Sequence, residues 1–401
     1  MNGRTEGRIS VIAGGMKKIE TVIVGGSYAG LSCARSAAAR GVETLVLERK
    51  RDLGEKIRTT GIFVGEAAEV LEVPDWLRRD ISGVRLYAPS LKSIDLKSPG
   101  YGFQAIDTPG LMRWMGRQAE WQGAEIRTGQ NVSQLEECSS GVVIEEAGVE
   151  AEFLVGADGA RSNVARLLGM PENREFLVGA EVEMIGVRGV DSSCLHVFLD
   201  SELAPGYIAW VVPGVGVTQI GLAVRKPHKP RLDAFLEKLE GLFDFREARV
   251  VERRGGLIPC GGAKREWYTE RSMLLGDAAG WVSPLTAGGI HASLQVGDAA
   301  GGAIADYLAG RLRHPASLLE WRRPEWRTKQ CMRWAMDHLP LPNSLLNLAV
   351  GNRLFEKLSQ VIFFHHRGLK DPEAWKAIFS SERGGLPIRG RQSLAEWFLS
   401  P

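Results

Sequence analysis

The sequence lacks any run of about 18 consecutive uncharged apolar residues, so it predicts no helix that spans a membrane. It contains only five cysteines, which are far apart and never in a C-x-x-C spacing. That pattern argues against a disulfide framework and against a structural metal site, and it is typical of reduced thiols in a cytoplasm. An excess of either charge is also missing, because the net charge is +2, which argues against a nucleic-acid partner.

Glycine, by contrast, is abundant: 48 of the 401 residues, against a typical share of roughly 7%. Most of this excess lies in short clusters. The chain is longer than the size at which one hydrophobic core keeps growing, so we expect two joined domains. Residues 1–16 contain no long apolar segment, and we interpret them as a disordered leader rather than a signal peptide.

The first glycine cluster lies within residues 21–48, which predict a buried strand, a tight turn, a helix and a second strand. A dinucleotide-binding βαβ unit needs glycines for the turn and for the approach of a pyrophosphate, and a carboxylate about 20 residues on for the ribose. Gly25, Gly30 and Glu48 fit this spacing, but Ser27 stands where the middle glycine is expected. The alternative is a tight turn without a ligand. The candidate contacts are Gly25, Ser27, Ala29, Gly30, Glu48 and Arg49.

Two later clusters have a similar form. Asp158 and Gly159 follow a predicted strand and precede Ser162, a predicted helix N-cap. Asp277 follows the apolar segment 273–275, where its carboxylate can accept a ribityl or ribose hydroxyl. An Asp-Gly turn alone is usually only a turn, but three such clusters in one chain point to a bound dinucleotide. The candidate contacts are Asp158, Gly159, Gly276, Asp277, Pro284, Gly288, Gly289 and Ile290.

The remaining regions predict a sheet and a helical end. Residues 176–256 alternate mainly with a period of two, interrupted by an amphipathic helix over 232–242, and this predicts a mostly antiparallel sheet that walls a substrate pocket. After Leu308 the chain is basic and rich in tryptophan, which a solvated helix face explains better than nucleic-acid binding. An apolar stripe over 345–362 predicts amphipathic helices that serve as core, as a dimer surface or as a contact with a bilayer surface.

The three clusters, in this order and at these separations, resemble the flavoprotein superfamily of p-hydroxybenzoate hydroxylase, and within it the geranylgeranyl reductase family. The resemblance covers residues 19–330 and implies FAD as the cofactor. It implies an α/β fold with a Rossmann-like FAD-binding domain, a mostly antiparallel substrate domain and a helical C-terminal segment. The expected divisions are 17–80, 106–175 and 268–330 for the FAD domain, 81–105 and 176–267 for the substrate domain, and 331–401 for the C-terminal segment.

The same resemblance assigns roles to the candidate cofactor contacts. It implies that Glu48 binds the adenosine ribose and that Asp158 and Gly159 lie near the phosphates. It places Asp277 at the ribityl and pyrophosphate region, and the backbone N–H groups of Gly289 and Ile290 against the isoalloxazine. Arg58 lies in a loop similar to the arginine-bearing loop of the hydroxylase, so the resemblance implies that it contacts FAD; the alternative is a solvated surface residue.

The segment 205–213 is similar to the P-x-x-Y-x-W-x-F-P motif of the reductases, with departures. Aligned on Trp210, the tyrosine of the motif falls on Ile208 and its phenylalanine on Val212. Because strand side chains alternate, we expect Tyr207 to point away from the face of Trp210. Relatives often carry cysteine in the loop that reads Thr59-Thr60 here, and flavin halogenases share a strand of this kind.

These features predict an FAD-dependent oxidoreductase that reduces C=C bonds of an isoprenoid or other apolar substrate by hydride transfer from reduced flavin. The alternatives are an FAD-dependent monooxygenase or halogenase acting through a peroxyflavin, and a non-catalytic prenyl-binding escort. His291 is the candidate proton donor, with an ordinary helix residue as the alternative. The electron donor is left open between NAD(P)H, another reductant and a donor protein. The predicted pocket wall is Phe198, Ile208, Trp210, Val212 and Pro213.

Overall fold

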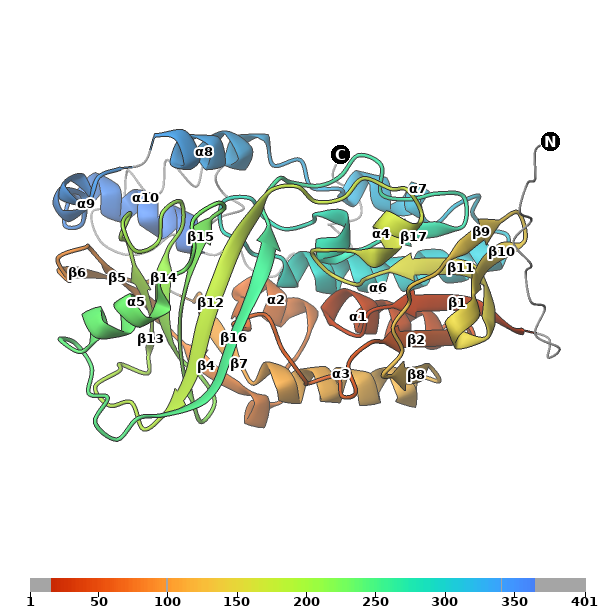
Figure 1. Ribbon diagram of the computed structural model, residues 1–401, viewed down its shortest axis with the longest axis horizontal. Coiled ribbons are helices and arrows are strands. Elements are labelled where there is room, and N and C mark those ends of the chain that lie inside the picture. Colours follow the sequence, from red (N-terminus) through yellow and green to blue (C-terminus); the bar gives the residue numbers. More distant parts are fainter. Residues whose placement is uncertain (1–15, 99, 340, 365–401) are drawn as a thin grey trace, which may run out of the picture.

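The computed structural model describes residues 16–364, except 99 and 340 (Figure 1). Residues 1–15 of the predicted leader and residues 365–401 of the predicted C-terminal segment lie outside the described residues. Two seven-stranded sheets lie at opposite ends of the described part, and a three-stranded sheet completes the strand inventory there. The predicted α/β class is confirmed.

The first large sheet has the strand order β8-β2-β1-β11-β10-β9. Strand β17 pairs with residues 154–156 at the end of β11, whereas β10 pairs with residues 149–151 of the same strand. Strands β8, β2, β1, β11 and β17 run parallel, and the β9-β10-β11 part is antiparallel. The inner strand β2, between β8 and β1, is buried along its whole length, which is typical of a parallel sheet. The strands are β1 (Lys17–Val24), β2 (Thr44–Glu48), β8 (Glu125–Thr128), β9 (Glu136–Cys138), β10 (Gly141–Ile144), β11 (Val149–Gly156) and β17 (Ser272–Leu274).

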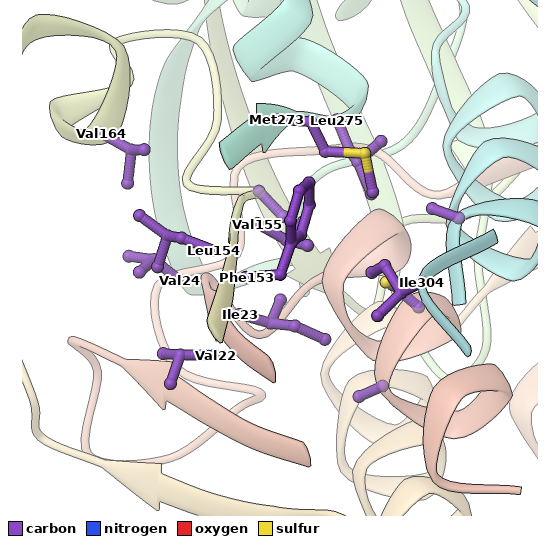
Figure 2. Close-up of a cluster of buried hydrophobic side chains, with 14 of the residues drawn as sticks. Val22, Ile23, Val24, Phe153, Leu154, Val155, Val164, Met273, Leu275 and Ile304 are labelled. Atoms are coloured by element: carbon purple, nitrogen blue, oxygen red, sulfur yellow. The ribbon is translucent and has the colours of Figure 1, made fainter. Parts of the chain in front are cut away.

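Helices α1 and α6, which belong to this half of the protein, pack closely on each other because small residues line their contact. A β-carbon at Gly301 of α6 would lie 2.6 Å from the carbonyl oxygen of Cys33 in α1, so a larger residue there would separate the two helices. Figure 2 shows the core beneath them, where β1 and β11 side chains meet Met273, Leu275 and Ile304. The helices of this half are α1 (Tyr28–Ala38), α2 (Gly65–Val70), α3 (Thr108–Trp121), α4 (Asn163–Leu167) and α6 (Ile290–Leu308).

The second large sheet has the order β16-β12-β15-β14-β13-β5-β6 and is antiparallel except for the parallel pair β13 and β5. The three-stranded sheet has the order β3-β7-β4. The strands are β3 (Ile62–Val64), β4 (Arg78–Ile81), β5 (Gly83–Tyr87), β6 (Ser93–Leu96), β7 (Phe103–Ile106), β12 (Phe176–Ile185), β13 (Cys194–Phe198), β14 (Ala209–Pro213), β15 (Thr218–Arg225) and β16 (Arg249–Pro259).

The second large sheet has two differently covered faces. Helix α5 (Leu232–Leu239) packs on one face, around Phe235 and Leu222. The opposite face contributes Val212 and Val197 to a cluster with Phe103 of β7. The predicted domain boundaries stay a prediction, although the two large sheets draw their strands from separate stretches of the chain.

The C-terminal helices α7 (Ala316–Leu319), α8 (Arg327–His338), α9 (Asn343–Ala349) and α10 (Arg353–Phe364) follow α6. Figure 1 shows α8, α9 and α10 beside the second large sheet. Phe364 of α10 is 1% exposed and belongs to the same cluster as Phe103. In the described part of the chain, none of the helices has the length and apolar character needed to cross a membrane. Short 3-10 turns also occur: η1 (Asp75–Leu77), η2 (Glu145–Ala147), η3 (Gly276–Ala279) and η4 (Glu320–Arg322).

Candidate functional site

The first cluster forms the turn between β1 and α1. Gly25 has a φ of +113°, and a β-carbon there would overlap the carbonyl oxygen of Ala157 after β11. A β-carbon at Gly30 would overlap the carbonyl oxygen of Gly25. Ser27 is the N-cap residue of α1, but its side chain makes no capping hydrogen bond. The turn therefore requires glycine at two of the predicted positions, and it brings the first and second clusters into contact.

Glu48 is the last residue of β2, and its carboxylate holds the backbone of this turn. Its Oε2 accepts a hydrogen bond from the Gly26 backbone N–H at 2.7 Å, and its Oε1 accepts one from the Lys50 N–H at 2.9 Å. The residue is 5% exposed, so these bonds offset the loss of water around a buried carboxylate. Arg49 is exposed beside it. The expected ribose contact of Glu48 stays a prediction. The hydrogen bonds by which Glu48 holds the turn were not predicted from the sequence.

Asp158 caps the short helix α4. Its Oδ1 accepts from the Ser162 hydroxyl at 2.6 Å, and its Oδ2 accepts from the Asn163 and Val164 N–H groups at 2.6 and 3.1 Å. Burial raises the pKa of this carboxyl despite these bonds. Ser162 is the predicted N-cap and accepts from the Ala165 N–H. Both oxygens of the Asp158 carboxylate thus accept hydrogen bonds from the protein itself. The expected place of Asp158 near the phosphates stays a prediction.

Asp277 differs from Asp158. Burial raises the pKa of its carboxyl to about 6, and no described residue donates a hydrogen bond to that carboxylate. A β-carbon at Gly289, the N-cap residue of α6, would lie 3.3 Å from its Oδ1. A partly buried acceptor without a donor, facing a glycine at a helix start, fits a ligand that brings hydroxyl groups.

Two residues that sequence reasoning missed tie the clusters together. Asn173 donates through Nδ2 to the carbonyl oxygens of Ala160 and Asp277, at 2.9 and 2.8 Å. Lys264 donates through Nζ to the Ala278 carbonyl oxygen at 2.7 Å, and burial lowers the pKa of its ammonium group to about 8. Neither residue lies in a recognisable motif, so no sequence signal pointed to it.

The loop after β2 lies against the second large sheet. A β-carbon at Gly256 in β16 would lie 3.3 Å from the carbonyl oxygen of Arg58. Thr60 donates from its hydroxyl to Glu181 Oε2 in β12 at 2.5 Å. Thr108 begins α3 after the N-cap Asp107, and its side chain is buried. This loop is therefore the junction between the nucleotide-type turns and the predicted substrate sheet.

Strand register divides the predicted pocket wall between the two faces of the sheet. Ile208 and Trp210 pack against the apolar cluster that contains Val212. Phe198 is opposite Ala209 and lies on the other face, stacked on Tyr87 with ring centroids 4.4 Å apart and packed on α5. The grouping of Phe198 with Trp210 on one face was wrong. In the pairing of β13 with β14, Val197 lies opposite Trp210, and Phe198 lies opposite Ala209. Pro213 ends β14, and strand alternation places it on the face opposite to Val212.

Tyr207 also differs from the expectation. It lies before β14, which begins at Ala209, so strand alternation does not fix its direction. Its hydroxyl donates to the Thr286 carbonyl oxygen at 2.6 Å, and burial raises the pKa of the phenol. Tyr207 and Trp210 pack against one small cluster around Cys260. The expectation that Tyr207 turns away from Trp210 was wrong, and the phenol reaches the loop of the third glycine cluster.

Comparison with known proteins places this geometry in a family. Residues 23–72 match the family model described as an NAD(P)-binding Rossmann-like domain. Digeranylgeranylglycerophospholipid reductase of Methanocaldococcus jannaschii is 27% identical over 336 residues, which are 80% of this chain and 85% of that protein. Digeranylgeranylglycerophospholipid reductase 2 of Methanopyrus kandleri is 30% identical over 313 residues, which are 72% of this chain and 77% of that protein. This chain belongs to the geranylgeranyl reductase family.

Solved structures agree with this geranylgeranyl reductase fold. A geranylgeranyl bacteriochlorophyll reductase-like protein of Thermoplasma acidophilum superimposes with a TM-score of 0.76 at 20% identity, covering 90% of this chain and 99% of that one. The halogenase PltM, solved as an L111Y mutant with FAD, gives 0.63 at 14% identity, covering 86% of each chain. At these identities the likeness shows the fold alone.

As a member of the geranylgeranyl reductase family, the protein is an FAD-dependent oxidoreductase. The residues present fit FAD, because the Asp277 carboxylate has no donor of its own and Gly25, Gly30 and Gly289 keep side chains out of the turns around it. Pro284 and Gly288 lie in the loop before α6, and Ile290 is its first residue. Their contacts with the cofactor stay predictions.

Proposed function

We propose that this protein reduces carbon–carbon double bonds of a long apolar, isoprenoid-like substrate. The names of the related reductases support this substrate class, and one structural observation carries it further. The apolar sheet face with Ile208, Trp210 and Val212 meets the cofactor-side loop at Thr60. A hydrocarbon chain lying against the half-buried side chains of Ile208 and Trp210 is therefore brought to the edge of the nucleotide-type turns.

The chain's own residues provide an apolar, water-excluding wall for this chemistry. The cluster around Trp210 is extended by side chains of the three-stranded sheet, of β5 and β6 and of α10. Transfer of hydrocarbon from water to such a surface is favourable by about 25 cal/mol per Å². The buried members of this cluster are Ile81, Val84, Leu86, Leu96, Phe103, Ala105, Leu195, Val197, Val212 and Phe364.

Bound in its reduced form, FAD supplies a hydride, and the alkene gains that hydride and a proton, so the double bond becomes single and the flavin is left oxidised. The protein must then hold a proton near the second alkene carbon. His291, the second residue of α6, is our candidate for this donor. Tyr207, whose hydroxyl is held by the Thr286 carbonyl oxygen, fixes the loop that leads into α6.

We also propose that the C-terminal helices contact a lipid surface that presents this substrate. An apolar groove of about 360 Å³ lies between α9 and α10, and Leu348 and Leu354 on its walls are 75% and 61% exposed. Phe355 lines the groove and also packs against the cluster around Trp210, so one side chain joins the two apolar regions. Arg353 of α10 supplies positive charge suited to anionic lipid headgroups.

The proposed reduction is tested by anaerobic reoxidation. The protein is loaded with FAD, reduced without oxygen, and mixed with a polyprenyl alkene. We expect the yellow colour of oxidised flavin to return with added alkene and not with its saturated analogue. A flavin that reoxidises only with oxygen, giving an oxygenated or halogenated product, overturns the proposal in favour of a monooxygenase or halogenase. A protein that takes up no FAD overturns every enzyme interpretation.

A further inference from the structure

A buried carboxylate stands between the cofactor-side loop and the proposed substrate wall. Glu181 lies on β12, and its side chain is 6% exposed. Its Oε2 accepts two hydrogen bonds, from the Trp210 indole Nε1–H at 2.7 Å and from the Thr60 hydroxyl at 2.5 Å. One oxygen atom therefore holds both a side chain of the substrate face and a side chain of the loop after β2.

The other oxygen of Glu181 is held as firmly. Arg254 of β16, with its side chain 5% exposed, donates through Nε at 2.7 Å and places Nη2 2.6 Å from Glu181 Oε1. The same Nη2 lies 2.7 Å from Glu183 Oε1, which also accepts from Gln219 Nε2 at 3.0 Å. The guanidinium compensates the buried carboxylates and fixes the rotamer of Glu181.

Sheet register explains why these residues meet. Glu181 is opposite Arg254 on one side and opposite Gly221 of β15 on the other, and Trp210 of β14 is also opposite Gly221. A β-carbon at Gly221 would lie 2.7 Å from two atoms of the indole ring. The indole therefore crosses over Gly221, which leaves its N–H within reach of Glu181 two strands away.

We propose that Glu181 is a positioning residue that fixes Trp210 in the substrate wall and ties it to Thr60 beside the cofactor turns. Tryptophan has a single hydrogen-bond donor, so one charged acceptor determines how its ring lies on the sheet. If that acceptor is removed, the indole N–H is left buried without a partner and the ring turns to find another. This inference rests on the proposed function, because Trp210 matters only if substrate lies against it.

The test compares Glu181→Gln with Glu183→Gln, each alone and combined with Trp210→Phe, in FAD-loaded enzyme. Glu183 is the matched control, because it lies on the same strand and contacts the same arginine but neither Trp210 nor Thr60. We expect Glu181→Gln to lower kcat/KM about tenfold, mainly through KM, with FAD content unchanged. We expect Glu183→Gln to change kcat/KM by less than about twofold, because it leaves Trp210 and Thr60 in place.

The double variants separate positioning from general stability. If Glu181 acts through Trp210, Glu181→Gln adds little once Trp210 is phenylalanine, which has no N–H to orient. Equal losses from the two glutamine variants, unaffected by Trp210→Phe, would overturn the inference. If Trp210→Phe itself leaves kcat/KM unchanged while the enzyme still reduces alkenes, the inference also fails, and the proposed function stands without it.

A measurement on the unaltered protein covers the case in which Glu181→Gln does not fold. The indole N–H resonance of Trp210, assigned by its loss in Trp210→Phe, reports the hydrogen bond directly. We expect it to be shifted downfield and to exchange slowly with solvent, as for a buried donor on a carboxylate. An indole proton that exchanges at the rate of an exposed tryptophan would overturn the inference.

Discussion

Gly30 lies against Gly25 so closely that a β-carbon at position 30 would overlap the Gly25 carbonyl oxygen. The obstructing atom belongs to the backbone of the nucleotide-type turn, so a side-chain rotation cannot relieve the clash. This contact fixes how the first turn of α1 sits on β1, and thereby where the backbone N–H groups of the turn point.

Replacing Gly30 with valine is therefore expected to abolish FAD retention, at a cost of roughly 3 kcal/mol or more in the native turn. The measurement is the ratio of flavin absorbance to protein absorbance after purification. Gly241 is a matched control, since a β-carbon there meets nothing within 4 Å, and Gly241→Ala should stay yellow. A yellow Gly30→Val protein would show that the turn does not bind the cofactor.

The carboxyl of Asp277 predicts a pH dependence of the FAD-free protein. Its pKa is raised to about 6 by burial, so the folded state binds the proton more tightly than the unfolded state. This contribution to stability is therefore greatest at low pH and is lost as pH rises from about 4 to about 6, up to roughly 3 kcal/mol.

Asp277→Asn removes that titration, so the variant should gain stability over the parent as pH rises from 4.5 to 7. The measurement is denaturant unfolding of both FAD-free proteins at the two pH values. A difference between the two proteins that does not change with pH would contradict a raised pKa at this carboxyl.

The two faces of the second large sheet predict different outcomes for two aromatic substitutions. Phe198→Leu removes a ring from the α5 side, so we expect about 1–2 kcal/mol of lost stability and an unchanged kcat/KM. Trp210→Phe should instead lower kcat/KM with little loss of stability. Thermal unfolding and steady-state kinetics on both variants provide the check, and the reverse pattern would mean that substrate lies on the α5 face.

Leu348→Glu combined with Leu354→Glu is expected to weaken binding to vesicles of phosphatidylglycerol and phosphatidylcholine by at least about tenfold, because two exposed leucines each lose apolar burial in lipid. Co-sedimentation measures this. Trp121, 80% exposed at the end of α3, offers the control Trp121→Glu, which should bind as the parent does. If the double variant sediments as the parent does, the groove between α9 and α10 is not the lipid contact.

Local patterns in the sequence predicted the elements well but not their partners. The strand, turn and helix at Gly25 could be predicted because their signals lie within a few neighbouring residues. The contact of Glu181 with Arg254 could not, because it joins residues 73 positions apart through a register that only the folded sheet sets. The predicted face of Phe198 was wrong for the same reason. The predicted direction of Tyr207 was wrong because β14 begins two residues later than the alternation suggested.

Mass spectrometry of the product distinguishes alkene reduction by bound FAD from a reaction that uses oxygen. Enzyme loaded with FAD is supplied with a chemical reductant and a polyprenyl substrate in the absence of oxygen. We expect a product that has gained two hydrogen atoms for each double bond reduced and no other atom. Substrate recovered unchanged without oxygen, together with a hydroxylated or halogenated product in its presence, would show that the protein is not an alkene reductase.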